Sequence, residues 1–393
     1  MRVFPWFAAV LLSLAFGQPV LAAPFVPQSD DQVLERLPAR AADPRVRDMA
    51  RMRQQLAASP RDMGLAVQLA RRYFEEVAAE GDPRYIGYAQ AALAPWWNEP
   101  LPPVPVRVVR AILKQFNHGF DEAVADLTSA VRDEPGNAEA WSWLAAIAMV
   151  QARYDDARAA CLNMGPLLTP LIGTACTASV DSVTGQANKA VADLRAGLKQ
   201  VPDASATELL WVLTRLAETE ERLGHHAEAE AVFVKAQALG QTDGYLLAAH
   251  ADFLLDRGRP AEVLTLLRGK ERSDLLLLRL AIAAKALNSP EAAAWSRDLG
   301  ARFDAARLRG DTVHQKEEAR FALAVLGDAP RALPLASANF VVQLEPADAR
   351  TLLEAALAAK QPAAAAPVLK WLETSGVESQ VLRSLATKIK ALS

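Results

Sequence analysis

The stretch Gly119-Phe120-Asp121-Glu122-Ala123, followed by the apolar Leu127, decides how this chain folds. It joins a turn residue, an acidic pair, a small residue and a large apolar residue in a fixed order. Variants of the same phrase surround Ala157, Ala190 and Ala229. Acidic residues stabilise the first turn of a helix, because the helix dipole is positive there. Each copy therefore predicts the start of a helix, and its small residue marks where that helix closely approaches a neighbour.

Nine small anchor residues recur along the chain in this way, 30 to 39 residues apart and about 34.5 on average. The anchors are Ala89, Ala123, Ala157, Ala190, Ala229, Val263, Ala293, Ala332 and Ala365. A period of about 34 residues accommodates two short amphipathic helices and their turns. Because a single pair of helices cannot bury its apolar face, neighbouring pairs must stack and share a core. The sequence therefore predicts an all-α array of antiparallel helix pairs.

The composition agrees with such an array. Hydrophobic residues make up 51% of the 393 residues and aromatic residues only 6%. Ala and Leu, which lose little conformational freedom in helices, predominate. The formal net charge is −3, and no block of like charge is long enough for a nucleic-acid-binding tail. We therefore expect no nucleic-acid partner.

The segment 138–170 resembles the tetratricopeptide repeat. The family's characteristic positions on the two helices are occupied by Trp141, Leu144, Ala145, Ala148, Ala157, Cys161 and Met164. Weaker copies extend the resemblance over about residues 60–376. The resemblance implies a right-handed superhelical solenoid of helix pairs. It also implies a non-catalytic scaffold that binds a protein or peptide partner, as exported members of the family do in envelope assembly, secretion or polymer export.

The first residues are typical of a secretory signal. Arg2 precedes an apolar stretch over 3–16, and small residues follow at Ala22 and Ala23. The apolar stretch is shorter than the roughly 20 residues of a membrane span, which disfavours a membrane anchor. We expect a periplasmic or secreted protein with no membrane span after signal cleavage. The expected segments are a signal peptide at 1–23, an N-terminal segment at 24–59 with helices near 31–37 and 44–58, tandem helix pairs at 60–376, and a capping helix at 377–393.

The sequence contains none of the common motifs for catalysis or cofactor binding. There is no Gly-x-Ser-x-Gly elbow, no phosphate-binding loop and no His-Glu-x-x-His pair, and only His225 and His226 are close histidines. We expect no enzyme, no metal and no cofactor. Paired carboxylates leave one alternative open, an enzyme or enzyme subunit acting on an envelope polymer through an acidic concave groove.

The resemblance implies that the first helices line a concave wall. The second, fifth, ninth, twelfth and thirteenth residues of each unit would contact a ligand there. In the early units this wall is apolar and carries Val108, Ile112, Phe116 and Met149. An apolar groove suits an inserted helix or an extended apolar segment of a partner.

In the middle units the same wall is acidic and carries two aromatic residues. The candidate residues are Trp211, Glu218, Glu221, Arg222, Tyr245, Asp252 and Asp256. Such a surface suits a basic or extended peptide, or a polysaccharide stacked on the aromatic rings. The alternative is a solvated acidic surface whose aromatic residues belong to the core.

Cys161 and Cys176 are the two cysteines of the chain. In an oxidising compartment they can form a disulfide. Otherwise they are two buried thiols that pack as small apolar groups. The sequence leaves both possibilities open, because it does not fix the geometry that a disulfide requires.

Overall fold

The computed structural model describes residues 43–80, 84–241 and 243–392. In these ranges the chain forms helices and no strands, which confirms the all-α prediction. Met49–Ser393 forms one compact unit. The predicted signal peptide at 1–23 and the predicted helix near 31–37 lie outside the described residues.

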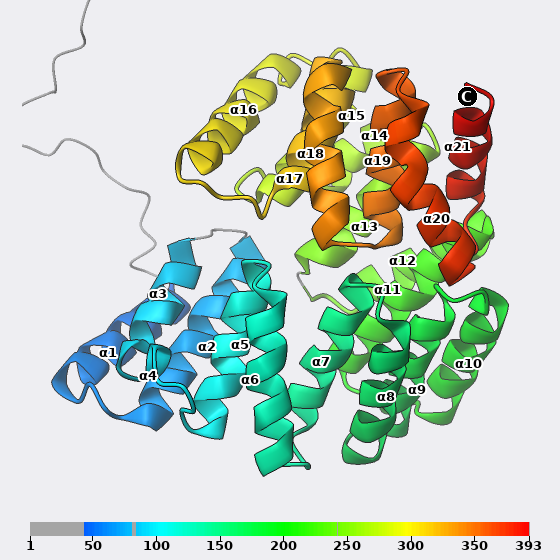
Figure 1. Ribbon diagram of the computed structural model, residues 1–393. Helices are drawn as coiled ribbons and strands as arrows, with labels where there is room; N and C mark the ends of the chain where they lie inside the picture. Colours follow the sequence, from blue (N-terminus) through cyan, green and yellow to red (C-terminus); the bar gives the residue numbers. More distant parts are fainter. Residues whose placement is uncertain (1–42, 81–83, 242, 393) are drawn as a thin grey trace, which may run out of the picture. The chain divides into compact units, whose positions relative to one another are not determined.

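Successive helices of the larger unit pair as antiparallel hairpins (Figure 1). Helix α1 (Pro44–Ala58) leads into the pairs α2 (Met63–Glu80) with α3 (Arg84–Ala92), α5 (Val104–Phe116) with α6 (Phe120–Asp133), α7 (Ala138–Val150) with α8 (Tyr154–Met164), and α9 (Pro170–Asp181) with α10 (Ala187–Gln200). The next pairs are α11 (Ala206–Leu223) with α12 (His226–Gln237), α13 (Gly244–Asp256) with α14 (Pro260–Leu266), and α15 (Asp274–Ala286) with α16 (Ala292–Leu308).

The C-terminal part continues the hairpins with less regular helices. Helix α17 (Gln315–Arg320) runs on as a π-helix over Phe321–Leu326 and pairs with α18 (Ala329–Val342). Helix α19 (Pro346–Ala358) is followed by a 3-10 turn over Pro362–Ala365, by α20 (Ala366–Ser375) and by the last helix, α21 (Gln380–Lys390).

The predicted anchors explain how the helices of each pair approach one another. Eight of the nine have no exposed surface, all except Ala293. In most pairs, a residue in the left-handed region of backbone conformation lies five positions before the anchor, as Gly224 (φ 85°) does before Ala229. The turn therefore returns the chain so that the fourth residue of the second helix meets the first helix, where only a small side chain fits.

The anchor predicted at Ala293 is wrong, because this residue is exposed. Trp295, two residues further on, is half-buried and packs against the cores of the α13–α14 and α15–α16 pairs. At this level the indole, and not the alanine, contacts the core.

The Pro-rich stretch over 96–105 is partly helical. Helix α4 (Ala94–Trp97) includes both tryptophans, and α5 already begins at Val104. Pro105 lies in the first turn of α5, where the missing backbone N–H has no intrahelical partner to lose. Residues 98–103 connect the first and second pairs.

Helix α11, which carries much of the site described below, has strong local boundaries. Ser205 and Glu208 form a capping box, with the Glu208 N–H donating to Ser205 Oγ at 3.3 Å and the Ser205 N–H to Glu208 Oε2 at 2.9 Å. At the other end, the left-handed Gly224 terminates the helix. These signals fix the register in which α11 presents its polar residues.

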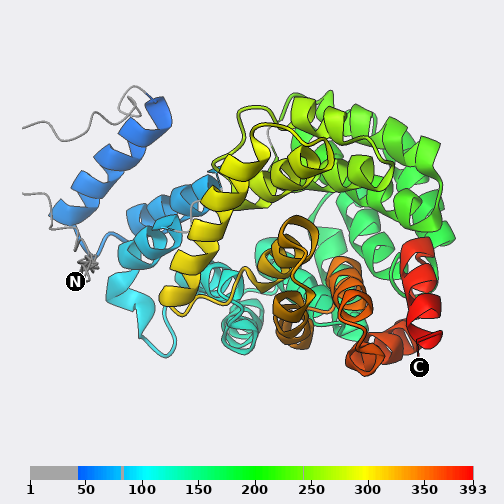
Figure 2. The ribbon, with the colours of Figure 1, turned by 90° about the horizontal axis from the view of Figure 1, so that it is seen from above.

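The C-terminal helices return to pack against the middle hairpins (Figure 2). Trp371 Nε1 donates to Tyr154 Oη at 3.2 Å, and the Leu344 N–H donates to the Val150 carbonyl at 2.8 Å. Gln380 Nε2 donates to the Leu223 carbonyl at 2.8 Å. Residues about 150 to 220 positions apart in the chain are thus neighbours, and the inner surface of the middle hairpins is covered by the chain itself.

Candidate functional site

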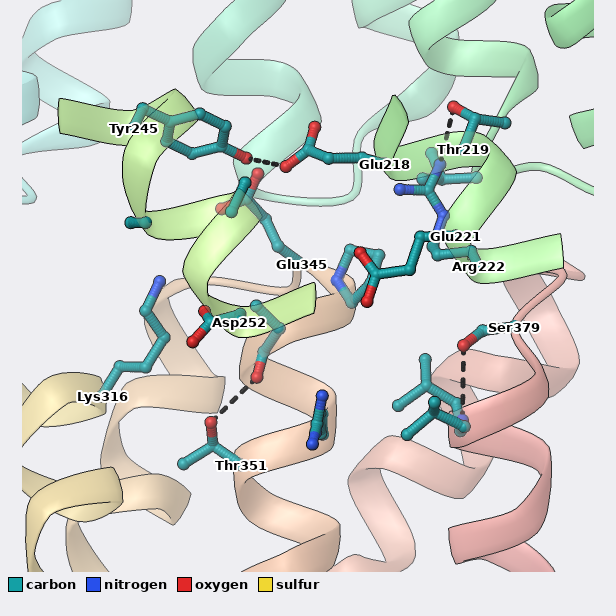
Figure 3. A pocket seen from close by; sticks show the side chains of 18 of the residues that line it. Glu218, Thr219, Glu221, Arg222, Tyr245, Asp252, Lys316, Glu345, Thr351 and Ser379 are labelled. Carbon is teal, nitrogen blue, oxygen red and sulfur yellow. Dashed lines mark hydrogen bonds between the residues drawn. The ribbon is translucent and has the colours of Figure 1, made fainter. Parts of the chain in front are cut away.

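A cavity of about 290 Å³ lies where the C-terminal helices cover the middle hairpins (Figure 3). Helices α11, α13 and α15 contribute to it on one side, and α17, α19 and α21 on the other. Its lining includes both acidic and basic side chains beside apolar ones. This volume is at the small end of the range of ligand pockets in proteins.

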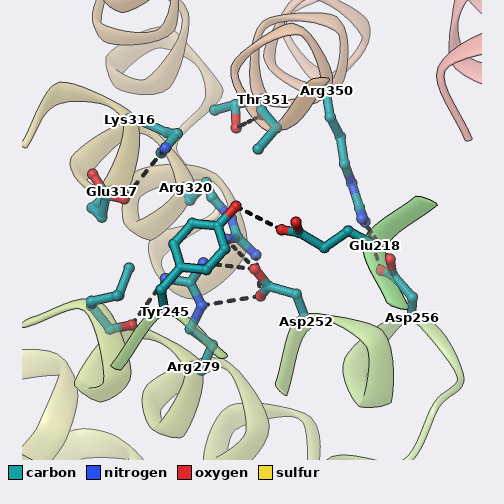
Figure 4. A network of polar contacts seen from close by, with 12 residues as sticks. Glu218, Tyr245, Asp252, Asp256, Arg279, Lys316, Glu317, Arg320, Arg350 and Thr351 are labelled. Carbon is teal, nitrogen blue, oxygen red and sulfur yellow. Dashed lines mark hydrogen bonds and ion pairs between the residues drawn. The ribbon is translucent and has the colours of Figure 1, made fainter. Parts of the chain in front are cut away.

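Asp252 of α13 is the centre of a network of ion pairs in this cavity (Figure 4). It accepts from Arg279 of α15 at 2.6 and 3.1 Å and from Arg320 of α17 at 2.8 and 3.0 Å. Burial alone would raise the pKa of Asp252, but the two guanidinium groups hold it well below its ordinary value. The carboxylate therefore holds α13, α15 and α17 together.

A second ion pair joins α13 to α19. Arg350 donates to both oxygens of Asp256, at 2.5 and 2.7 Å, and its Nε donates to Glu354 at 2.7 Å. Such two-point contacts between a guanidinium and a carboxylate are among the stronger hydrogen bonds in proteins. Arg350 therefore fixes the C-terminal helices over the cavity.

Glu218, Arg215 and Tyr245 form a third group. The Tyr245 hydroxyl donates to Glu218 Oε1 at 2.6 Å, and Arg215 Nη1 lies 3.2 Å from Glu218 Oε2. The Arg215 guanidinium also lies over the Tyr245 ring, 4.7 Å from its centroid. This is a cation–π contact, and it holds the ring against α11.

Glu221 and Arg222, adjacent on α11, differ from these groups because neither has a partner of opposite charge. No hydrogen bond to the Glu221 carboxyl occurs in the described ranges. Burial raises its pKa to about 8, and the nearby carboxylates of Asp256, Glu218 and Asp252 add to the effect.

Arg222 donates only to neutral oxygens. Its Nη2 lies 2.9 Å from Ser182 Oγ and 3.3 Å from Thr219 Oγ1, and its Nε is buried without a hydrogen bond. Burial lowers its pKa from the ordinary value. Among the described residues, no carboxylate oxygen lies within 4.0 Å of this guanidinium.

The structure brings together most of the predicted acidic surface. Glu218, Glu221, Arg222, Tyr245 and Asp252 all line the cavity, and Asp256 lies beside it in a second pocket. The predicted acidic groove also contains basic residues. Arginines of α15, α17 and α19 neutralise its carboxylates, and the helices that carry them cover it.

Trp211 lies apart from the cavity and is 36% exposed. Leu167 and Leu168, each 40% exposed, precede Thr169, whose Oγ1 donates to Glu208 Oε1 at 2.5 Å, three residues before Trp211 on α11. That hydrogen bond holds the loop before α9 against the first turns of α11. We name Leu167, Leu168 and Trp211 the apolar edge.

The prediction of an apolar groove in the early units is wrong for two of its residues. Val108 and Ile112 are 1% and 4% exposed and belong to the core shared by α5, α6 and α7. Phe116 is half-buried in an edge-to-face contact with Phe74, whose ring centroid is 6.2 Å away. Helix α2 packs on α5 and covers the face that the repeat pattern leaves open. Only Met149 lines the cavity.

Cys161 and Cys176 are joined by a disulfide, with 5.5 Å between their Cα atoms. It links α8 to α9 and lies in the core of these two helices. The structure therefore has the bonded form of the two possibilities that the sequence leaves open.

The sequence did not predict the arginines that complete the cavity. Arg350, and with it Glu354, could have been predicted, because they are the fifth and ninth residues of their unit when it is counted from the anchor Ala365. Arg279 and Arg320 do not fall at those positions, and nothing in their local sequence marks them.

Two general features of the described residues bear on function. No group of three or more His, Cys, Asp and Glu side chains is placed to hold a metal ion within the described ranges. No helix within them has both the length and the hydrophobicity that crossing a membrane requires.

Residues 119–167, which span α6 to α8, match a family model described as tetratricopeptide repeat. Among solved structures, the chain is similar to the crystal structure of the P58(IPK) TPR domain, with 14% sequence identity and a TM-score of 0.21 over 90% of this chain and 94% of that chain. At this TM-score the similarity carries no information on shape or function. No curated protein matches the chain.

Proposed function

The chain is a tetratricopeptide-repeat protein, and we propose that it acts as a non-catalytic, exported scaffold that binds a protein partner in the cell envelope. Proteins built from this repeat present surfaces to other proteins. Assembly of the envelope, secretion and polymer export are the processes in which exported scaffolds of this kind take part.

Two features support export. The pattern over 1–23 has the charge, apolar stretch and small residues of a cleavable signal. The disulfide between Cys161 and Cys176 suits an oxidising compartment, where such bonds persist. Export is tested by the N-terminal sequence of the protein recovered from the periplasm or medium. We expect it to start at Ala23 or Pro24, and a chain that keeps Met1 in the cytoplasm would contradict export.

The apolar edge is the observation that carries the scaffold proposal. Tryptophan is one of the residues that most often dominate binding energy in protein interfaces, and Trp211 is 36% exposed. Tyr245 is already engaged by Arg215 and Glu218, so the two aromatic residues do not form an open platform for a polysaccharide. We therefore propose a protein partner that contacts Trp211.

The experiment is affinity capture from an envelope extract with three versions of the mature protein. Wild type is compared with a Trp211→Ala, Leu168→Ser variant and with Tyr88→Ala, which removes an exposed aromatic residue (50%) from α3. We expect a partner that wild type and Tyr88→Ala recover equally and that the apolar-edge variant loses. Equal recovery by all three would contradict the proposed surface.

The enzyme alternative rests on one observation, the raised pKa of Glu221. A carboxyl group that keeps its proton at neutral pH can serve as a general acid. A second catalytic carboxylate is harder to assign, because Asp252 and Asp256 are held by arginines. The test is the release of reducing ends or peptides from purified envelope polymers. Activity in wild type that disappears in Glu221→Gln would establish an enzyme and overturn the scaffold proposal.

A further inference from the structure

Glu221 and Arg222 present an acidic and a basic side chain without a charged partner to the same cavity. Most other charged residues of the lining are in contact with opposite charges, as in the pairs Asp252 with Arg279 and Arg350 with Glu354. Glu345 is an exception, because it makes no ion pair within 4.0 Å with a described residue. Glu221 and Arg222 make no ion pair within 4.0 Å, either with each other or with another described residue. Two neighbouring groups on α11 thus keep an unused hydrogen-bonding capacity toward the cavity (Figure 3).

The arrangement around Arg222 costs free energy. A charged group taken out of water needs an opposite charge or several hydrogen bonds to offset its lost hydration. Arg222 has only neutral partners and a buried Nε without one. Glu221 avoids such a cost by keeping its proton. A bound molecule that brought a negative charge to Arg222 would remove the cost there.

The surroundings determine which charge fits at each end. Arg222 lies beside the hydroxyl oxygens of Ser182 and Thr219 and attracts an anion such as a carboxylate. Glu221 lines the same cavity without a charged partner, so its carboxylate, once ionised, can pair with a cation. An organic ammonium, which needs fewer oxygen ligands than Ca²⁺ or Mg²⁺, is a cation that fits.

We propose that the cavity binds a small zwitterion of the amino-acid type, with its carboxylate on Arg222 and its ammonium beside Glu221. The cavity of about 290 Å³ has room for such a molecule. The ligand would contact α11 and, across the cavity, the C-terminal helices that cover it. This inference does not depend on the apolar edge or on its protein partner.

Binding is coupled to the protonation of Glu221. An ammonium beside this carboxyl favours its ionised form, so binding near neutral pH releases a proton and affinity rises with pH. The other charged groups that face Glu221 come from α11, α12, α13, α19 and α21. They are Glu218, His226, Asp252, Asp256, Arg257, Arg350, Glu354 and Lys388.

The test is calorimetry and thermal shift of the mature protein with each proteinogenic amino acid in turn. For any that binds, its amide, which lacks the carboxylate, and its N-acetyl form, which lacks the ammonium, are measured as well. We expect at least one amino acid to bind. Both of its blocked forms should bind at least about tenfold more weakly, because each loses one charge-assisted hydrogen bond. If no amino acid binds, or if the blocked forms bind equally well, the proposal fails.

Variants locate the site. Arg222→Gln and Glu221→Gln should each weaken binding by at least about tenfold, and Glu221→Gln should also abolish the rise of affinity with pH. Arg132→Gln and Glu228→Gln, at exposed positions outside the cavity, are the matched controls and should bind as wild type. Unchanged binding in Glu221→Gln would overturn the proposal even if Arg222→Gln failed to fold. Capture of the protein partner should be unaffected by either variant, which separates this test from that of the scaffold.

Discussion

Arg350 of α19 donates to both carboxylate oxygens of Asp256 on α13, at 2.5 and 2.7 Å, across 94 residues of sequence. Together with Arg320 on Asp252, this pair connects the C-terminal helices to the inner surface of the middle hairpins. In an open array of repeats, each unit contacts only its neighbours. Here the chain covers part of its own inner surface, which turns a predicted groove into a cavity.

Replacing Asp252 with asparagine should destabilise the protein strongly. The change removes the charge that Arg279 and Arg320 share, and Arg279 is only 4% exposed. We expect the free energy of unfolding, measured in urea, to fall by about 2–4 kcal/mol, because breaking one side of a buried ion pair leaves the other uncompensated. Glu75→Gln, which removes an exposed ion pair with Arg72, should change it by less than about 1 kcal/mol. Equal effects of the two variants would show that Asp252 does not connect the helices.

Enlarging a buried anchor should cost more than enlarging an exposed one. Ala229 has no exposed surface and packs in the core with Phe233. Ala229→Leu should lower the free energy of unfolding by about 1–3 kcal/mol through overpacking. Ala293→Leu, at the exposed anchor position, should stay within about 0.5 kcal/mol of wild type. Thermal or urea unfolding of the two variants side by side gives the comparison, and a tolerated Ala229→Leu would contradict the role assigned to the anchors.

The hairpins could be predicted from the sequence because their signals are local and repeated. Each buried anchor follows a turn at a fixed distance, so the pattern around Ala123 reappears around Ala157 and Ala190. Ala293 follows its turn, at Asn288, at the same distance, yet Trp295 takes over the contact. The neighbouring helix pair determines which of two nearby side chains fills the space between the helices. That helix pair is not part of the local sequence pattern.

Much of the wall of the site could be predicted, but its cover could not. Glu218 and Asp252 occupy repeat positions that face inward, so counting from the anchors finds them. Arg320, which pairs with Asp252, and Arg350, which pairs with Asp256, come from units far along the chain. No local pattern shows that these units fold back. The prediction that Val108 lines a groove was wrong for the same reason. Counting from the anchor identifies a residue that faces inward, but it does not show that α2 already covers that residue.

Glu221 should make the stability of the protein depend on pH. Its pKa in the folded protein, about 8, lies above the ordinary value of 4.5, so the folded chain holds this proton more tightly than the unfolded chain. The stabilisation is complete at low pH and is lost as the pH rises through about 8, by at most about 1.4 kcal/mol per pH unit. In Glu221→Gln, which has no proton to lose, the free energy of unfolding should fall less steeply between about pH 5 and 8.

Urea unfolding at several pH values measures this slope for wild type, Glu221→Gln and the exposed-site control Glu228→Gln. We expect the control to keep the wild-type slope. If Glu221→Gln keeps it as well, the carboxyl of Glu221 is not protonated in the folded protein at neutral pH.

Removing the disulfide should destabilise the array at α8 and α9. The bond between Cys161 and Cys176 spans 15 residues, and closing a loop of that length contributes about 3 kcal/mol through the reduced entropy of the unfolded chain. The Cys161→Ala, Cys176→Ala variant should lose stability of about this size, as should the wild type under reductant. Mass spectrometry should show that the denatured wild type gains two hydrogen atoms on reduction, and an unchanged mass would mean free thiols.

The closure of the array by its own C-terminal helices is tested most directly by a double-mutant cycle across Asp256 and Arg350. The free energy of unfolding is measured for wild type, Asp256→Asn, Arg350→Gln and the double variant. Because the two side chains touch in the folded protein, we predict a coupling energy of about 1–3 kcal/mol. Effects that add to within about 0.3 kcal/mol would show that α19 does not rest on α13, and would contradict the existence of the covered cavity.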